Sequence, residues 1–468
     1  MTLKKNFIYD KSFYLKALKL SLPMMIQSGI TNFVSMLDNI MIGALGTEAM
    51  SGVSVANQLV IIFNSVMFGA TAAGGIFVSQ YFGARSENGI RNTFRIKTYV
   101  NLFITAITVI LIVLFGDAAI AAYLKPDGTN GNVELSFAYG KEYMTIALIG
   151  LFPFAISQVF SSTLCEIEET KIPMYSGLVA LVTNCGLNLV LIFGLLGFPA
   201  MGVRGAAIAT VISRIVEMLF LIAITYLKRN KFTFIDGVFK TLKVPPQLLK
   251  NILIKGSPLI LNELIWSLAI AIKNLCISKS GLEAVAAMNI QSTVFSVLSI
   301  TYFSLASSIG IIVGGFLGAG KLQQARSASK KLLVFATLIG VVMGILQLAI
   351  SPVFPLLYNT EDSVRSLATF MIAVSSAAAP LNAMAMSAMF TIRSGGRTLI
   401  VMLFDCVHSL FATALAACIF AYVIPVGVHT LFIIVTVAEG TKALLGAIMV
   451  SKVRWEKNIT SIKSSVSL

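Results

Sequence analysis

Long apolar stretches recur from near the start of this chain to its C-terminal end. Of its 468 residues, 57% are hydrophobic and only 12% are charged, whereas soluble domains carry about 25% charged residues. A helix that spans a bilayer needs about 20 residues. Twelve such helices are expected, near 15–42, 52–78, 98–122, 142–164, 173–197, 205–227, 256–278, 283–314, 332–353, 367–391, 399–423 and 429–450. The sequence therefore predicts an all-α polytopic membrane protein.

The net charge of +15 indicates topology, not a nucleic-acid partner. Loops expected on one side hold 27 of the 35 Lys and Arg residues, at 1–19, 79–97, 165–172, 228–255, 315–331, 392–398 and 450–468. The opposite loops hold five, namely Lys125, Lys141, Arg204, Lys279 and Arg365, and the apolar segments hold Arg214, Lys273 and Lys442. Cytoplasmic loops are enriched in Lys and Arg. We therefore expect a multi-pass plasma-membrane protein with both termini in the cytoplasm.

Sequence motifs for enzymatic chemistry are missing. The chain has no G-x-x-x-x-G-K-[ST] phosphate loop, no Gly-rich dinucleotide turn and no H-x-x-x-H metal pair. Its five Cys residues lie in or beside apolar segments without metal-ligand spacing, so they are expected to be small buried hydrophobes. No cleavable signal is expected before the first span. These features predict a protein that is not an enzyme, has no cofactor and carries out transport driven by an ion gradient.

The two halves of the chain are related. A shift of 235 positions aligns Pro23 with Pro258, Asn39 with Asn274, Gly46 with Gly281, Glu48 with Glu283, Gly75 with Gly310, Gly83 with Gly318 and Arg91 with Arg326. Six helices return a chain to its starting side, so the halves form a parallel repeat. We expect six-helix lobes at 1–227 and 256–468, a cytoplasmic loop at 228–255, and a central cavity that opens alternately to the two sides.

The stretch from Leu20 to Gly46 carries a charge within an apolar segment. Its polar residues recur every three or four positions and so share one helix face, consisting of Gln27, Thr31, Ser35 and Asp38. A charge inside a membrane costs at least about 2.5–3.5 kcal/mol. We expect Asp38 to be neutral or cation-bound in one state and released in another; the alternative is an interfacial aspartate that contacts water.

Oxygen ligands for a cation are available on two later helices. Asn184 and Asn188 are four residues apart and share a face, and Thr210 lies on the following helix. Amide and hydroxyl oxygens suit hard cations, so Asp38, Asn184 and Asn188 are candidate Na⁺ ligands. The alternative is that these side chains only form hydrogen bonds across helices.

The second half has its own deep charges. Glu263 is flanked by Asn262 and Trp266, and Lys273 occupies the repeat position of Asp38. Glu263 is a candidate proton or cation site, with an ion pair to another helix as the alternative.

Two further pairs of polar residues are each one turn apart. Asp405 and His408 are candidates for a proton relay, although a membrane histidine is more often a packing residue. Glu439 and Lys442 are expected to satisfy each other locally.

Three segments resemble the multidrug and toxic compound extrusion (MATE) family. They are LDNIMIGALGTEAMSGVSVANQ, NELIW and VGGFLGAGKLQQAR, and the six-plus-six repeat adds to the resemblance. The resemblance implies a twelve-helix antiporter that exports bulky, often cationic compounds in exchange for Na⁺ or H⁺. It also places family cation-site residues at Asp38, Asn184, Asn188, Thr210 and Glu263. Asn188 and Asn382 stand where some members have an aspartate.

The expected function is therefore cation-coupled export of small organic compounds by a monomer in the lipid bilayer, with H⁺ or Na⁺ as the coupling ion. The candidate substrate-cavity residues are Gln27, Thr31, Ser35, Asn262, Trp266, Lys273 and Asn382. One alternative is a lipid-linked oligosaccharide flippase of the wider fold. A pyrophosphate substrate would need several deep Arg or Lys, however, and this chain has at least as many deep carboxylates, which favours cationic or neutral substrates. A non-transporting scaffold or receptor is the alternative from another class.

Overall fold

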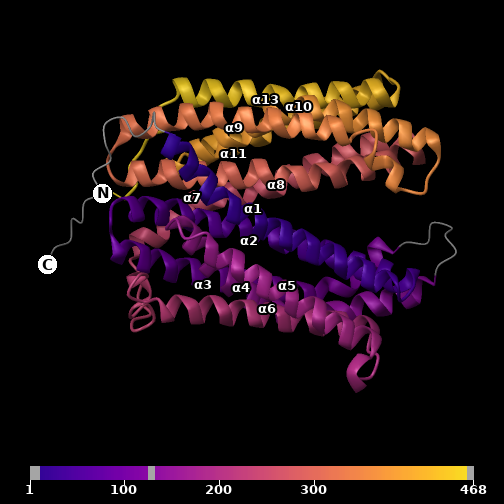
Figure 1. Ribbon diagram of the computed structural model, residues 1–468, viewed down its shortest axis with the longest axis horizontal. Helices are drawn as coiled ribbons and strands as arrows, with labels where there is room; N and C mark the ends of the chain where they lie inside the picture. Colours follow the sequence, from indigo (N-terminus) through magenta and orange to yellow (C-terminus); the bar gives the residue numbers. More distant parts are fainter. Residues whose placement is uncertain (1–10, 125–131, 461–468) are drawn as a thin grey trace. The chain divides into compact units, whose positions relative to one another are not determined.

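The computed structural model describes residues 11–124 and 132–460 and is helical throughout, without strands in that part of the chain (Figure 1). The first half holds α1 (Lys11–Gly43), α2 (Thr47–Gly83), α3 (Glu87–Tyr123), α4 (Val133–Glu166), α5 (Lys171–Phe193), η2 (Leu195–Gly197), α6 (Gly202–Leu227) and η3 (Thr233–Ile235). The second half holds α7 (Pro246–Ser278), α8 (Leu282–Gly318), α9 (Leu322–Ile350), η4 (Phe354–Leu357), α10 (Asp362–Ser394), α11 (Thr398–Val407), η5 (His408–Ala414), α12 (Leu415–Cys418), η6 (Ile419–Val423) and α13 (Val428–Lys452). Lys125 and the two chain ends, on which part of the predicted topology rests, lie outside the described residues.

The predicted set of twelve long helices is confirmed. Eleven helical segments in the described ranges are long and apolar enough to cross a membrane, with Thr398–Val423 counted as one. The remaining long helix is α1, whose polar face lowers its mean hydropathy. The chain is therefore a multi-pass helical membrane protein.

Several predicted helix starts were wrong, and one predicted helix has an unexpected conformation. The helices α3 and α9 begin at Glu87 and Leu322, eleven and ten residues before the expected positions, and α4 begins at Val133, nine residues before. The seventh helix begins at Pro246, ten residues before the expected position, because proline fits the first turn of a helix, where its missing N–H is not needed. The expected helix at 399–423 is not α-helical throughout. It contains π-helical turns at His408–Ala414 and Ile419–Val423, and such bulges often mark functional sites.

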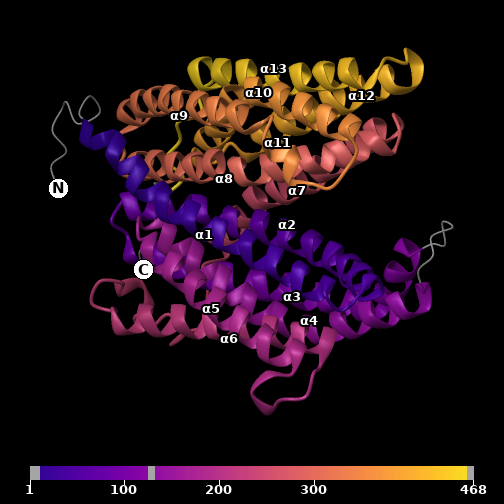
Figure 2. The ribbon, with the colours of Figure 1, turned by 45° about the vertical axis from the view of Figure 1, so that its right-hand side comes forward.

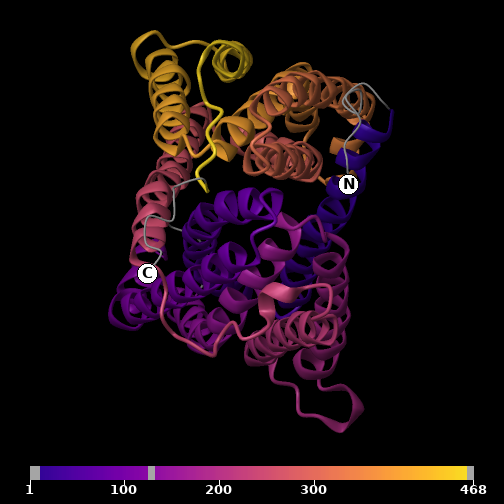
Figure 3. The same ribbon diagram turned by 90° about the vertical axis from the view of Figure 1, so that its left-hand side faces the viewer.

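The chain forms two compact units. Of the described residues, unit 1 comprises those within 1–25, 79–86 and 253–468, and unit 2 comprises those within 26–78 and 87–252. In unit 1, α10 packs against α8, α9 and α13 (Figure 1), over a buried apolar core shared by α7, α8, α10, α12 and α13. In unit 2, α6 packs against α4 and α5 (Figure 2), and the core gathers side chains from α1 to α6. Figure 3 shows the last helix, α13 (yellow), nearly end-on. The predicted lobe boundaries stay a prediction.

The repeat is visible in backbone conformation. Gly46 and Gly281, which the repeat aligns, both have positive φ, +123° and +106°. These angles are rare for residues that carry a Cβ. The aligned Pro23 and Pro258 both lie inside long helices.

Within unit 1 the last turns of α2 and α8 meet backbone to backbone. A Cβ added to Gly83 would overlap the carbonyl group of Gly315, and a Cβ added to Gly318 would overlap the carbonyl group of Gln80. The repeat aligns Gly83 with Gly318 and Gln80 with Gly315. The two contacts are therefore the same contact made twice, and both require glycine.

Candidate functional site

Three of the four polar residues predicted to share a face of α1 line a cavity in unit 2. Thr31, Ser35 and Asp38 border it, whereas the Gln27 amide donates a hydrogen bond of 3.1 Å to Ser161 Oγ on α4. The hydroxyls of Thr31 and Ser35 donate to the backbone carbonyls of the residues four positions earlier, at 3.1 and 3.2 Å. Two hydroxyls and one carboxylate of α1 therefore border the cavity.

Asp38 is the end of a chain of polar side chains that joins α1, α5 and α6. The Asn188 amide nitrogen donates to Asp38 Oδ1 at 2.5 Å and to Asn184 Oδ1 at 3.1 Å. The Asn184 amide nitrogen in turn donates to Thr210 Oγ1 at 3.4 Å. Four of the five residues predicted as the cation or proton site thus lie together in unit 2, whereas the fifth, Glu263, belongs to unit 1.

One oxygen of this cluster has no partner. Asn188 Oδ1 is buried, and no hydrogen-bond donor reaches it within residues 11–124 and 132–460. A buried polar atom without a partner costs about 1–3 kcal/mol. Together with the Asp38 carboxylate and the Thr210 hydroxyl, this oxygen forms a set of hard ligands of the kind that suits Na⁺.

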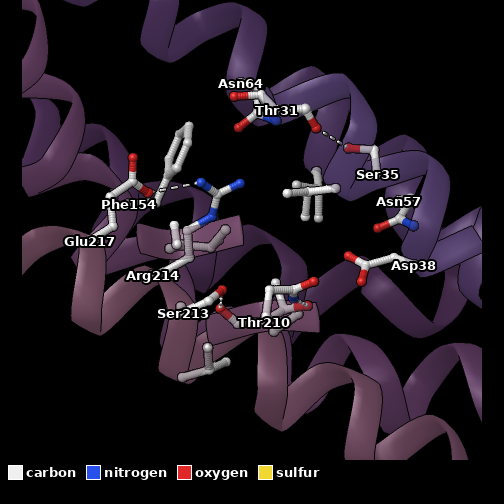
Figure 4. Close-up of a pocket in the computed structure, with 18 of the residues that line it drawn as sticks. Thr31, Ser35, Asp38, Asn57, Asn64, Phe154, Thr210, Ser213, Arg214 and Glu217 are labelled. Atoms are coloured by element: carbon white, nitrogen blue, oxygen red, sulfur yellow. Dashed lines mark hydrogen bonds and ion pairs between the residues drawn. The ribbon is translucent and has the colours of Figure 1, made fainter. Parts of the chain in front are cut away.

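The cavity has a volume of about 260 Å³ and combines polar and apolar walls. Figure 4 shows Asp38, Asn57, Thr31 and Ser35 around one part of it, and Arg214, Glu217 and Phe154 around another. Arg214 Nη1 donates to Glu217 Oε2 at 3.0 Å, and its guanidinium lies 5.0 Å from the centre of the Phe154 ring. The apolar residues that line the cavity include Ile30, Val34, Val60, Ile61, Leu151 and Val211.

In unit 1 a second polar cluster joins α7, α11 and α13. The Asn262 amide donates to Asp405 Oδ2 at 2.9 Å, and Lys442 forms an ion pair with Asp405 Oδ1. All three side chains are buried or nearly so, since the exposed fractions of the Asp405 and Lys442 side chains are 3% and 13%. Glu263, next to Asn262, lies within electrostatic range of Lys442 and Arg393.

The structure corrects the predicted pairing of charges on α13. Glu439 and Lys442 do not satisfy each other; Glu439 pairs with Lys273 of α7 at 2.7 Å, and Lys442 pairs with Asp405. The local pairing was wrong because helix packing brings Lys273 of α7 and Asp405 of α11 within ion-pair distance of these two residues, which spacing along α13 does not report. His408 forms a hydrogen bond of 2.8 Å with Thr441.

Five of the predicted substrate-cavity residues are not among the residues that line the unit 2 cavity. Gln27 bonds Ser161, and Asn262 and Lys273 belong to the unit 1 pairs described above. Trp266 and Asn382 lie on α7 and α10, both in unit 1.

A family model described as MatE matches residues 23–190 and 258–423, which together make up most of the chain. The chain belongs to the MatE family. The two matched segments begin at the aligned prolines Pro23 and Pro258, so the family model also follows the repeat.

Known members of the MatE family are similar over most of this chain. The "Probable multidrug resistance protein NorM" of Thermotoga maritima is 28% identical over 335 residues, which cover 70% of this chain and 68% of that protein. A crystal structure of MATE in the bent conformation has a TM-score of 0.85 at 19% identity, covering 96% of this chain and 97% of that one. A MOP superfamily transporter from Pyrococcus furiosus has a TM-score of 0.79 at 18% identity, covering 93% and 94%. These relatives are transporters and not enzymes, as the sequence predicted for this chain.

Sequence reasoning missed part of the site in this MatE protein. Asn57 and Asn64 on α2, Tyr143 on α4 and Glu217 on α6 line the cavity but were not among the predicted residues. Asn57 and Asn64 are seven residues apart, so they share a helix face, and this spacing was a usable signal. Tyr143 gave no such signal, because nothing in the sequence distinguishes it from other aromatic residues that pack helices.

Proposed function

We propose that this MatE protein is a cation-coupled antiporter that exports amphipathic organic compounds. The observation that carries the proposal is the set of Asp38, Asn184 and Thr210 on the wall of the unit 2 cavity, with the Asn188 amide hydrogen-bonded to both Asp38 and Asn184. A carboxylate beside a cavity of this kind binds either a coupling cation or a cationic compound. An exchange mechanism requires a single site that both the coupling cation and the exported compound use.

Charge compensation at Asp38 supplies the coupling. With Asp38 ionised, its carboxylate attracts a cationic compound into the cavity and accepts the hydrogen bond from Asn188. When H⁺ or Na⁺ neutralises the carboxylate, the attraction is lost and the hydrogen bond weakens, because charge-assisted hydrogen bonds are about twice as strong as neutral ones. The ion can shift the conformational equilibrium only if it binds one conformation of the protein more tightly than the other.

The cluster could serve either coupling ion. Na⁺ would use the Asp38 carboxylate, the buried Asn188 Oδ1 and Thr210 Oγ1, all of them hard oxygen ligands. H⁺ would need the Asp38 carboxylate alone. The two are distinguished by which gradient drives transport.

The position of the protein in the cell follows from its charge distribution. We propose that it is a monomer in the plasma membrane with both termini in the cytoplasm, because the loops on that side carry 27 of the 35 Lys and Arg residues. Compounds would then leave the cytoplasm by alternating access, with the energy of the ion gradient.

The pairing of deep basic residues does not favour a lipid-linked oligosaccharide flippase. Arg214, Lys273 and Lys442 each form an ion pair with a carboxylate, Glu217, Glu439 and Asp405 respectively. A pyrophosphate group would have to compete with these carboxylates for every one of the three cations.

The proposal is tested with purified protein in vesicles loaded with the fluorescent cation ethidium. A pH gradient and a Na⁺ gradient are imposed separately, and a labelled lipid-linked sugar is assayed in parallel. We expect ethidium flux to follow one gradient. Sugar flipping without gradient-driven ethidium flux would overturn the proposal in favour of the flippase, and no flux of either kind would favour a scaffold or receptor.

A further inference from the structure

The cavity in unit 2 carries a guanidinium group as well as a carboxylate. Arg214 and Asp38 both line it, from α6 and α1, and Figure 4 shows them in different parts of the lining with apolar side chains between them. A site for simple cations has no need of a fixed positive charge, which repels them. The role of Arg214 therefore requires a separate explanation.

Most of the hydrogen-bonding capacity of Arg214 is unused. Its guanidinium has five N–H donors, and in the part of the chain that the structure describes its hydrogen-bond partner is Glu217. The side chain is 28% exposed, and its guanidinium carbon lies 5.0 Å from the centre of the Phe154 ring. Contact with an aromatic ring holds a guanidinium in place, and its unused N–H donors can bind a planar anion such as a carboxylate.

The remaining lining suits an aromatic or apolar body. Phe154 and Tyr143 of α4 line the cavity together with aliphatic residues of α1 and α2. Because the Arg214–Glu217 pair is neutral as a whole, it leaves Asp38 as the uncompensated charge among the cavity's charged lining residues. A compound with an amine at one end and a carboxylate at the other would place the amine near Asp38 and the carboxylate near Arg214.

We propose that Arg214 is a specificity-determining residue that gives this cavity a preference for zwitterionic amphipathic compounds over cations of the same shape. This inference deepens the proposed export function and rests on it. Glu217 acts as a movable counter-ion that the carboxylate of the compound displaces. The coupling ion then competes for the amine-binding end alone, because it binds at Asp38.

A matched pair of dyes tests this preference. Rhodamine B carries a delocalised cation and a free carboxylate, and rhodamine B ethyl ester is the same dye with the carboxylate masked. Binding of each dye to the purified protein in detergent is measured by fluorescence polarisation. We expect the wild type to bind rhodamine B at least about tenfold more tightly than the ester, the factor that one charge-assisted hydrogen bond of 1.4 kcal/mol gives.

Four variants separate recognition from structure. Arg214→Gln is expected to lose the preference but to bind the ester within about twofold of wild type, and Arg214→Lys to keep part of it. Glu217→Gln is expected to bind rhodamine B more tightly, because the guanidinium is released from its partner. Arg204→Gln is the control, since Arg204 begins the same helix, pairs with Glu142 and does not line the cavity.

The inference is overturned if wild type binds the ester as tightly as the acid, if Arg214→Gln keeps the preference, or if neither dye binds. Ethidium efflux from vesicles distinguishes this failure from failure of the proposed function. Efflux by the wild type without any dye preference would leave the export function standing and remove the role of Arg214. Dye preference without gradient-driven efflux would leave the role of Arg214 standing and remove the export function.

Discussion

Asn188 Nδ2 lies 2.5 Å from Asp38 Oδ1, although the two residues are 150 positions apart in the chain. This hydrogen bond joins α1 to α5 beside the cavity of unit 2. The same nitrogen also donates to Asn184, so two hydrogen bonds fix the orientation of the Asn188 amide. The amide oxygen of Asn188 is buried and has no partner in the described ranges. Asn188 therefore fixes the position of the carboxylate and presents an oxygen next to it.

Replacement of Asn188 by Leu should impair ion coupling more than substrate binding. Asp38 would lose a charge-assisted hydrogen bond, worth about 1.5–3 kcal/mol, and the cation site would lose its buried amide oxygen. We expect the initial rate of gradient-driven ethidium efflux to fall at least about tenfold, with ethidium affinity in detergent changed less than about threefold. Asn230→Leu, at an exposed position, is the control. Equal rates for both variants would show that Asn188 only packs helices.

The crossing of α2 and α8 predicts that Gly318 cannot be replaced. A Cβ at Gly318 would overlap the Gln80 carbonyl, whereas a Cβ at Gly315, on the same stretch of α8, meets nothing within 4 Å. Gly318→Ala should therefore destabilise by about 1–3 kcal/mol through overpacking. Gly315→Ala should be neutral or stabilising, because alanine is the better helix former. Thermal unfolding of both variants in detergent measures the difference, and equal midpoints would contradict the close approach.

The buried ion pair between α3 and α4 predicts a strong coupling of two mutations. The Lys97 ammonium lies 2.8 Å from Glu166 Oε2 and also donates to the hydroxyls of Ser162 and Thr163. Its side chain is 0% exposed. Lys97→Met would leave a buried carboxylate without its partner, at a cost of about 3–5 kcal/mol.

Addition of Glu166→Gln to Lys97→Met should restore most of the lost stability, because no buried charge then remains. The measurement is a double-mutant cycle on the unfolding free energy in mixed micelles. Strictly additive effects of the two mutations would show that the pair does not behave as a buried unit.

The fold was predictable because each helix is long and apolar. Length and hydropathy alone indicated all twelve segments, and glycines and prolines at a fixed offset indicated the repeat. The start of α7 at Pro246 was not predictable in this way, because two Lys, one Gln and one Asn interrupt the apolar residues of 246–255 and make this stretch resemble a loop. Helix geometry beyond the membrane depends on packing, which hydropathy does not report.

The candidate site was partly predictable for a similar reason. The sequence places four polar residues in apolar surroundings, namely Asp38, Asn184, Asn188 and Thr210. A polar residue inside a membrane costs free energy, so each of them stands out as a candidate functional residue. Which of them meet depends on how α1, α5 and α6 pack, and sequence spacing does not determine this. The partners of Lys273 and Lys442 show the same limit, since local spacing suggested a pair on α13 and the structure gives partners on α7 and α11.

The most direct test of the coupling role of Asp38 is gradient-driven ethidium efflux by Asp38→Asn, measured beside the wild type. Asp236→Asn is the matched control, because Asp236 is an exposed aspartate outside the cavity. The substitution keeps the shape of the side chain and removes the charge that the coupling ion must neutralise. We predict that Asp38→Asn loses the response to the imposed gradient, whereas Asp236→Asn keeps it. Full gradient-driven efflux by Asp38→Asn would contradict the account.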